Sequence, residues 1–251
     1  WSGIYLNTLF SLYDVTKSAT HLEYAEKFAD GLYNYAINKD TWLPYSKVNI
    51  TDGAVIDDAC IVPMECGRLI GGYMKGYEIT TNETYLFRAW NLTLGFWRLR
   101  DLDTDLVPIS FNATSGNIAL NWNEPDLDPI QNVLWYAYQI SHDEDFFDVA
   151  YDMTVAQIKY GWQNGRIVHA LWLNGTIKDS HSDLTGGAQM YIASLAQLYI
   201  LTGYGIYDEY LLKAQAFWDY LQQRAKVNGL YVRYLYSCLL YTSPSPRDRQ
   251  K

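Results

Sequence analysis

The apolar positions of the chain follow helical spacing, and they recur in a repeated pattern. In four places a tyrosine is followed by Thr or Ser at the third position after it. An alanine stands at the twelfth position after the tyrosine in three copies and at the fifteenth in the last. The tyrosines are Tyr13, Tyr77, Tyr138 and Tyr199, at intervals of 64, 61 and 61 residues. Self-similarity at a fixed period is typical of repeat architectures. The sequence therefore predicts four copies of one structural unit.

Each copy is predicted to be a helical hairpin. The first helix, as in residues 69–77 or 191–199, is apolar on nearly all sides, which is typical of a helix buried all round. The second, as in residues 21–33, has one apolar face and one charged face. Buried helices that alternate with one-sided helices fit an inner ring wrapped by an outer ring, so we expect an all-α fold of the (α/α)6 toroid type. An open solenoid of helix pairs is the alternative, although its repeat is usually about 34 to 47 residues long.

The domain organisation follows from the number of hairpins. A closed barrel of this type has six, so we expect residues 1–237 to be an incomplete barrel with about four of the six hairpins. Small residues such as Gly71, Gly72, Ala193 and Ser194 are expected to let the inner helices approach closely. Residues 238–251 resemble the translation of a transposase sequencing adaptor, and we expect this tail to be non-native and to make few contacts with the helices.

Charge and composition narrow the class of partner. The 251 residues carry a net charge of −9 without a basic cluster, which argues against nucleic acid or an anionic membrane. No apolar run reaches the roughly 18 residues that a membrane-spanning helix needs. Five Asn-x-Thr triplets, the acceptor pattern for N-glycosylation, favour a secreted glycoprotein whose leader is missing from the sequence, and we expect a monomer. The triplets begin at Asn49, Asn82, Asn91, Asn112 and Asn174.

The connections between hairpins are where we expect the functional site. They cover about residues 39–57, 101–126 and 165–183, and loops of this length in a compact domain are usually functional. All three should lie at one end of the barrel. Aromatic rings stack on sugar rings, and polar groups fix their orientation, so an oligo- or polysaccharide is the expected substrate. The candidate substrate-binding residues are Trp42, Tyr45, Trp122, Glu124, Trp172, His181 and Asp183.

Four carboxylates are the candidate catalytic residues: Asp57, Asp58, Glu65 and Asp126. The first two are adjacent at the predicted start of an inner helix, where a helix N-cap explains only one of them. Glu65 is expected on the same helix face as Asp58, and Asp126 at the same height on the next inner helix. We expect an oxygen of Asp57 or Asp58 within about 10 Å of Glu65 or Asp126, since two carboxyls at such separations can flank a glycosidic bond.

Structural roles for these carboxylates remain open, because Glu65 can pair with Arg68, and Asp126 and Asp183 can each cap a helix. Cys60 and Cys66 are expected to be core thiols that point in different directions and do not bridge. Four histidines without ligand spacing indicate no metal site, and the absence of a nucleotide-binding fingerprint indicates no cofactor.

Three segments carry a family resemblance: Val55-Ile-Asp-Asp-Ala-Cys60 before an apolar helix, Tyr77-Glu-Ile-Thr80, and Tyr85-Leu-Phe-Arg-Ala89. They resemble the six-hairpin glycosidases, most closely glycoside hydrolase family 76, the endo-acting α-1,6-mannanases. The resemblance implies nucleophile and acid/base roles for Asp57 and Asp58 in a retaining mechanism. The chain departs from that family directly after the acidic pair, where the family usually has Asn or Gln and an aromatic residue. A second resemblance, through residues 43–49 and 228–231, is to the class I α-mannosidases of family 47.

These observations favour a glycoside hydrolase that acts on a mannan-like or related glycan. Two alternatives stay open. One is a sugar epimerase, isomerase or polysaccharide lyase on the same barrel, with a histidine such as His181 among its acid/base groups. The other is a non-catalytic barrel that binds glycans through Trp122 and Trp172.

Overall fold

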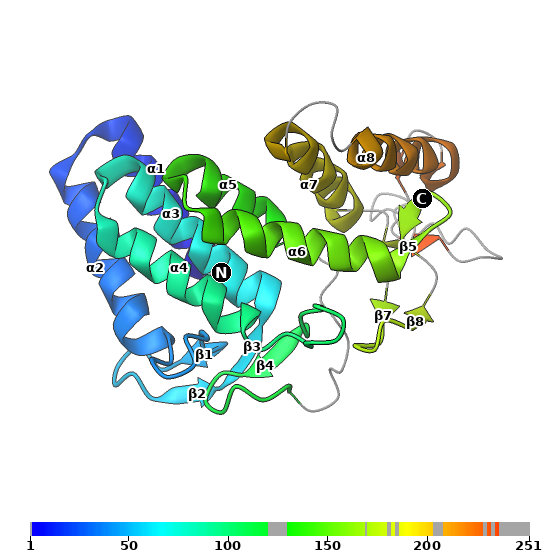
Figure 1. Cartoon of the computed structure of the whole chain (residues 1–251). Coiled ribbons are helices and arrows are strands. Elements are labelled where there is room, and N and C mark those ends of the chain that lie inside the picture. Colours follow the sequence, from blue (N-terminus) through cyan, green and yellow to red (C-terminus); the bar gives the residue numbers. More distant parts are fainter. Residues whose placement is uncertain are drawn as a thin grey trace, which may run out of the picture.

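The computed structural model describes residues 2–119, 130–168, 170–179, 182–183, 186–202, 208–227, 230–231 and 234–235. It confirms four helical hairpins (Figure 1). Their helices are α1 (Ser2–Thr16) and α2 (Ala19–Ala36), α3 (Arg68–Thr80) and α4 (Glu83–Trp97), α5 (Gln131–Ser141) and α6 (Glu144–Gly161), and α7 (Gly186–Thr202) and α8 (Asp208–Tyr220). Two short π-helical segments, η1 (Val62–Gly67) and η2 (Leu221–Ala225), precede α3 and follow α8. The predicted non-native tail lies outside the described residues.

The repeated tyrosine motif marks the end of each first helix. The carbonyl oxygen of Tyr77 accepts a hydrogen bond from the amide of Thr81, which has a left-handed backbone with φ of 57°. The same bond joins the Tyr138 carbonyl to the amide of His142, where φ is 56°. Carbonyls at a helix end need such partners, because they have none within the helix. The motif is thus a helix C-cap that turns the chain into the second helix.

The helices form two layers, as expected for the toroid type. The first helices contact one another in chain order, α1 with α3, α3 with α5 and α5 with α7, and each second helix packs on its own partner. Close approach depends on small residues, since a Cβ on Gly72 would lie 2.8 Å from the carbonyl oxygen of Gly3. Gly71 does not have this role, because a Cβ there would meet only the Val133 side chain, at 3.6 Å.

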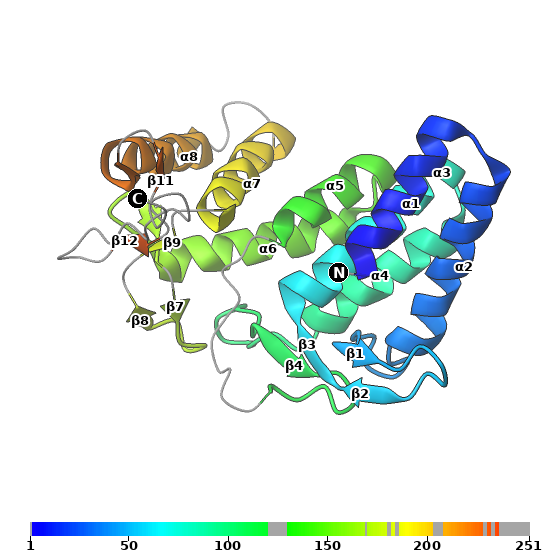
Figure 2. The same cartoon turned by 180° about the vertical axis from the view of Figure 1, so that it is seen from behind.

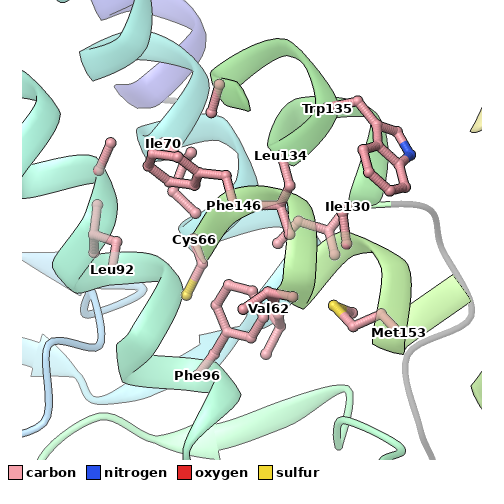
Figure 3. Close-up of a cluster of buried hydrophobic side chains, with 14 of the residues drawn as sticks. Val62, Cys66, Ile70, Leu92, Phe96, Ile130, Leu134, Trp135, Phe146 and Met153 are labelled. Carbon is pink, nitrogen blue, oxygen red and sulfur yellow. The ribbon is translucent and has the colours of Figure 1, made fainter. Parts of the chain in front are cut away.

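The core lies between the two layers. Figure 3 shows the part of it around the start of α3, where side chains from α3, α4, α5 and α6 meet. Its aromatic and aliphatic members are fully or almost fully shielded from solvent and include Val62, Ile70, Leu92, Phe96, Ile130, Leu134, Trp135, Phe146 and Met153. This apolar packing positions η1 and the loops that are attached to it.

The long connections contain short strands that the sequence pattern did not predict. The described strands are β1 (Lys47–Val48), β2 (Val55–Asp57), β3 (Ala59–Ile61), β4 (Ser110–Asn112), β5 (Trp162–Gln163), β6 (Arg166–Ile167), β7 (Ala170–Leu171), β8 (Ile177–Asp179), β9 (Ser182–Asp183), β10 (Lys226–Val227), β11 (Leu230–Tyr231) and β12 (Tyr234–Leu235). They pair antiparallel, β1 with β2, β3 with β4, β5 with β6, β7 with β8, β9 with β12 and β10 with β11.

Strands from each of the three long connections lie at one end of the helices. Both views show β1 to β4 and β7 with β8 on the same side, opposite the turn between α1 and α2 and the turn between α3 and α4 (Figures 1 and 2). The expectation that the long loops share one end is therefore confirmed for these segments. The β3–β4 pair joins the first connection to the second.

Candidate functional site

Asp57 and Asp58 lie in an extended segment and not at a helix start. Asp57 ends β2, Asp58 follows it, and β3 continues the strand to Ile61, after which η1 begins at Val62. The predicted N-cap role of one of the two is therefore wrong. The physical reason is that residues 55–61 find strand partners on both sides, β1 before the pair and β4 after it. Helical structure starts only where Pro63 enters the first turn, a position that proline tolerates.

Asp58 is held by the second long connection. Its Oδ2 accepts a hydrogen bond from Nδ2 of Asn112 in β4 at 2.7 Å, and its carbonyl oxygen accepts one from the amide of Ala113 at 2.6 Å. The side chain is half-buried. In the sequence, Asn112 stands out only as the start of a glycosylation triplet, and no sequence signal links it to Asp58 across 54 residues.

Asp57 and Glu65 both bind the backbone of β3. Oδ1 of Asp57 accepts a hydrogen bond from the amide of Ala59 at 3.0 Å, and Oε2 of Glu65 accepts one from the amide of Ile61 at 2.8 Å. Amides two residues apart in a strand point to the same edge. The β4 strand occupies the other edge, where the amide of Val62 donates to the carbonyl of Ile109. The carboxylates of Asp57 and Glu65 therefore lie on one common edge of β3.

The two carboxylates are anchored at separate points along the strand. Since a strand rises about 3.3 Å per residue, the amides of Ala59 and Ile61 that bind Asp57 and Glu65 are roughly 7 Å apart. Successive side chains of a strand point to opposite faces, so Asp58 diverges from Asp57 and reaches toward Asn112. The expectation that Glu65 and Asp58 share a helix face is wrong, because Asp58 lies outside the helix.

Asp57 and Glu65 differ in their surroundings. The side chain of Asp57 is exposed, whereas Glu65 is half-buried in η1. Burial raises the pKa of Glu65, and the Ile61 amide and the positive charge of Arg68 act in the opposite direction without cancelling that effect. A carboxyl with a raised pKa holds its proton to higher pH and is suited to donate it.

The predicted aromatic residues have different environments. Trp42 is half-buried with its ring centroid 6.0 Å from that of Tyr33 and 5.7 Å from that of Phe87. The hydroxyl of Tyr45 accepts a hydrogen bond from Asn38. Trp172 is 42% exposed, and Nζ of Lys178 lies 4.7 Å from its ring centroid. Of these three aromatic residues, Trp172 presents the most open surface for a ligand.

Several predicted residues remain untested. Trp122, Glu124, Asp126 and His181 lie outside the described residues, and for Asp183 only the backbone is described. That backbone is extended in β9 opposite Tyr234, and α7 begins three residues later, at Gly186. The predicted capping of α7 by the Asp183 side chain stays a prediction. The convergence of all four candidate carboxylates stays a prediction.

Two other kinds of site have no counterpart among the described residues, and one groove lies apart from the carboxylates. Within the described ranges, no group of three or more metal-ligating side chains is found, and no helix is both long and apolar enough to cross a membrane. A groove of about 370 Å³ lies between α2 and the β1–β2 connection. Its lining includes Phe28, Tyr35, Asn49 and Ile50 but neither Asp57 nor Glu65, so it is separate from the carboxylates.

Solved structures share this fold. No protein-family model matches the sequence, and a search of the curated proteins returns no match. A D-mannose isomerase aligns with a TM-score of 0.75 at 15% identity over 93% of this chain and 63% of its own. A cellobiose 2-epimerase from Bacillus thermoamylovorans B4167 aligns with a TM-score of 0.73 at 15% identity, over 94% of this chain and 63% of the epimerase. A family 105 glycoside hydrolase from C. acetobutylicum ATCC 824 aligns with a TM-score of 0.65 at 12% identity, over 86% of this chain and 61% of the hydrolase.

These likenesses establish the architecture. The chain has the (α/α)6 toroid fold of sugar-processing enzymes, and it spans a little over three fifths of the length of the three structures named. At such low identity the comparison shows fold and not activity. None of the three is a family 76 enzyme, so the family expected from the sequence remains a prediction.

Proposed function

We propose that this chain is the toroid of a carbohydrate-active enzyme that hydrolyses a glycosidic bond at the loop end of the helices. The observation that carries the proposal is the placement of Asp57 and Glu65 on one edge of β3. Glycoside hydrolysis requires two carboxyl groups, one to protonate the leaving oxygen and one to act on the sugar from the other side. The fold shared with sugar-processing enzymes supports the saccharide as the substrate class.

The environments of the two groups suggest a division of labour. Glu65, whose pKa is raised by burial, is the general acid that protonates the glycosidic oxygen. Asp57, which is exposed, is the base that activates a water molecule. Asp58 positions the loop through its hydrogen bond with Asn112.

The spacing favours inversion at the anomeric carbon. Retaining enzymes have carboxyls about 5 to 5.5 Å apart, and inverting enzymes about 6.5 to 9.5 Å, which leaves room for water. The amides that bind Asp57 and Glu65 are two residues apart in β3, roughly 7 Å, and this supports the wider of the two separations. We propose the pair of Asp57 and Glu65 in place of the retaining pair of Asp57 and Asp58 implied by the resemblance to family 76, because adjacent strand residues diverge. A mannan-like polymer remains the proposed substrate on the strength of that resemblance.

The test compares Asp57→Asn and Glu65→Gln with Asp52→Asn in the full chain. Asp52 is a matched control, since it is also exposed and its Oδ1 also accepts a hydrogen bond, at 3.0 Å, from the amide two residues on. Reducing-sugar release from an α-1,6-linked mannan should fall about 10²- to 10⁴-fold in the first two variants and stay unchanged in the third. Retention of full turnover in both site variants, with folding intact by circular dichroism, contradicts the proposal. Proton NMR of the first product reports inversion or retention.

Interconversion of sugars is the second candidate, because two of the similar structures are a D-mannose isomerase and a cellobiose 2-epimerase. The third connection contains two histidines, His169 and His181, which are outside the described residues. Wild-type protein that epimerises or isomerises a sugar without cleaving it, and that loses this activity on His181→Ala but not on Asp57→Asn, favours this candidate over hydrolysis.

Secretion and N-glycosylation belong to the same proposal. Asn82 and Asn174 are exposed, so a glycan on either is compatible with the fold. Nδ2 of Asn112 instead donates to Asp58, and a glycan on that nitrogen would interfere with this bond. After expression through a eukaryotic secretory pathway, the mass of the protein should fall on Asn174→Gln and on Asn82→Gln, and activity should survive both changes.

A further inference from the structure

Two cysteines face each other beneath the candidate site. Sγ of Cys60 in β3 and Sγ of Cys66 in η1 are 3.5 Å apart, and both side chains are fully buried. The expectation that these side chains point in different directions is wrong. Since residues 60–61 are extended and residues 62–67 turn helically, the chain folds back and brings residue 66 over residue 60. The expectation that they are buried core thiols is confirmed.

The surroundings of the pair are apolar. Figure 3 shows the sulfur of Cys66 in the hydrophobic cluster, near Leu92 and Phe96 of α4 and Val62 of η1. The same fold-back is closed by the bond from the Ile61 amide to Glu65. The cysteines therefore belong to the same segment as Asp57 and Glu65, and their side chains lie on its buried side.

We propose that Cys60 and Cys66 form an intrachain disulfide when the chain folds in the presence of a small-molecule disulfide such as oxidised glutathione. One cysteine, as its thiolate, attacks a sulfur of the oxidant and releases one thiol, which gives a mixed disulfide. The second cysteine then displaces the remaining half of the oxidant. In sum, two cysteine thiols lose two hydrogens and two electrons, and one disulfide of the oxidant is reduced to two thiols.

The geometry requires only a small movement. A disulfide brings its sulfurs to about 2.05 Å, so the two Sγ atoms must close by roughly 1.5 Å, which rotation of two short side chains supplies. Burial raises the pKa of the Cys60 thiol, and an enclosed thiol is slow to exchange. Oxidation is therefore expected during folding, before η1 packs into the core, and the finished bond is expected to resist reductants in the native state.

The consequence for the fold is a covalent link between β3 and η1, the segment that leads into α3. This link lies beyond the proposed function and does not depend on it, because its readout is mass and thiol content. It holds the edge on which Asp57 and Glu65 lie whether or not these groups perform hydrolysis.

The experiment uses the full chain with Cys238→Ser, which leaves Cys60 and Cys66 as the remaining thiols. One sample is refolded with reduced and oxidised glutathione and a second with excess dithiothreitol, and each is then unfolded in denaturant with iodoacetamide. The oxidised sample should take up no alkyl group and be lighter by two hydrogens than the reduced, unalkylated chain, with a linked peptide after digestion. The reduced sample should take up two alkyl groups.

Cys66→Ala in the same background is the control, and it should show a single alkylated thiol and no linked peptide under both conditions. The melting temperature of the oxidised form should exceed that of the reduced form by about 5 °C, as expected for a short closed loop in a chain of this length. Two alkylated thiols after oxidised refolding, or separate glutathione adducts on the two cysteines, overturn the proposal.

Discussion

The close contact of α1 with α3 gives the most direct test of the architecture. In Gly72→Ala, the added Cβ would lie 2.8 Å from the carbonyl oxygen of Gly3 and 3.1 Å from Cβ of Leu6. The nearest atom belongs to the backbone, so it cannot rotate away, and the two helices must separate. Overpacking of this kind costs about 1 to 3 kcal/mol, while the exchange of Gly for Ala in a helix interior gains about 1 kcal/mol. The expected net result is a loss of up to about 2 kcal/mol.

Gly31→Ala is the matched control, because Gly31 is also inside a helix, α2, and an added Cβ there meets nothing within 4 Å. It should gain about 0.5 to 1 kcal/mol from helix propensity alone. Urea unfolding measures the free energy of both variants, provided that the m-value stays constant. Equal stabilisation by the two substitutions would refute the close packing of the inner helices at Gly72.

Three further predictions address the site and its support. Burial raises the pKa of Glu65 in the folded state, so its contribution to stability is fully present below the unfolded pKa and is lost as the pH rises through the folded pKa. In urea unfolding, the stability of Glu65→Gln relative to wild type should therefore improve from pH 4 to pH 7. Glu23→Gln should show the opposite slope, because Lys27 lowers the pKa of Glu23. Arg88→Ala should lower the unfolding free energy by about 3 kcal/mol, because the buried guanidinium of Arg88 packs against Tyr33 and binds Asp30 at 2.6 Å. Arg100→Ala, in a more exposed pair, should lower it by less than about 1 kcal/mol. Equal losses in the two variants would argue against the buried packing of Arg88. Asn112→Ala should lower the unfolding free energy by about 1 to 2 kcal/mol and reduce turnover by the loss of its bond to Asp58, and kinetics indistinguishable from wild type would contradict a positioning role for this asparagine.

The hairpins were predictable from the sequence because their determinants are local. The tyrosine carbonyl and the capping amide are four residues apart, as in the pair of Tyr77 and Thr81, and the hydroxyl of Thr80 donates to the carbonyl of Gly76 within the same turn. Each copy therefore shows its turn in a short stretch of residues, and the repeat makes it visible four times.

The site was predicted less completely because its contacts are distant in sequence. β3 contains three residues and finds its partner in β4, about fifty residues later, and neither strand is long enough to show an alternating pattern. Glu65 is a candidate from the sequence, where its expected neighbours are Asp58 on the same helix face and Asp126 on the next inner helix. Only the β3 strand determines that Asp57, and not Asp58, lies on the edge that Glu65 shares.

The order of contacts among the inner helices also bears on how the chain is made. Each of α3, α5 and α7 packs against the inner helix of the preceding hairpin, so a hairpin finds a docking surface already present when it leaves the ribosome. Assembly can then advance one hairpin at a time without long searches. The β3–β4 pair is formed only when the chain has been synthesised past Asn112, so the carboxylate edge becomes anchored after its helices and not with them.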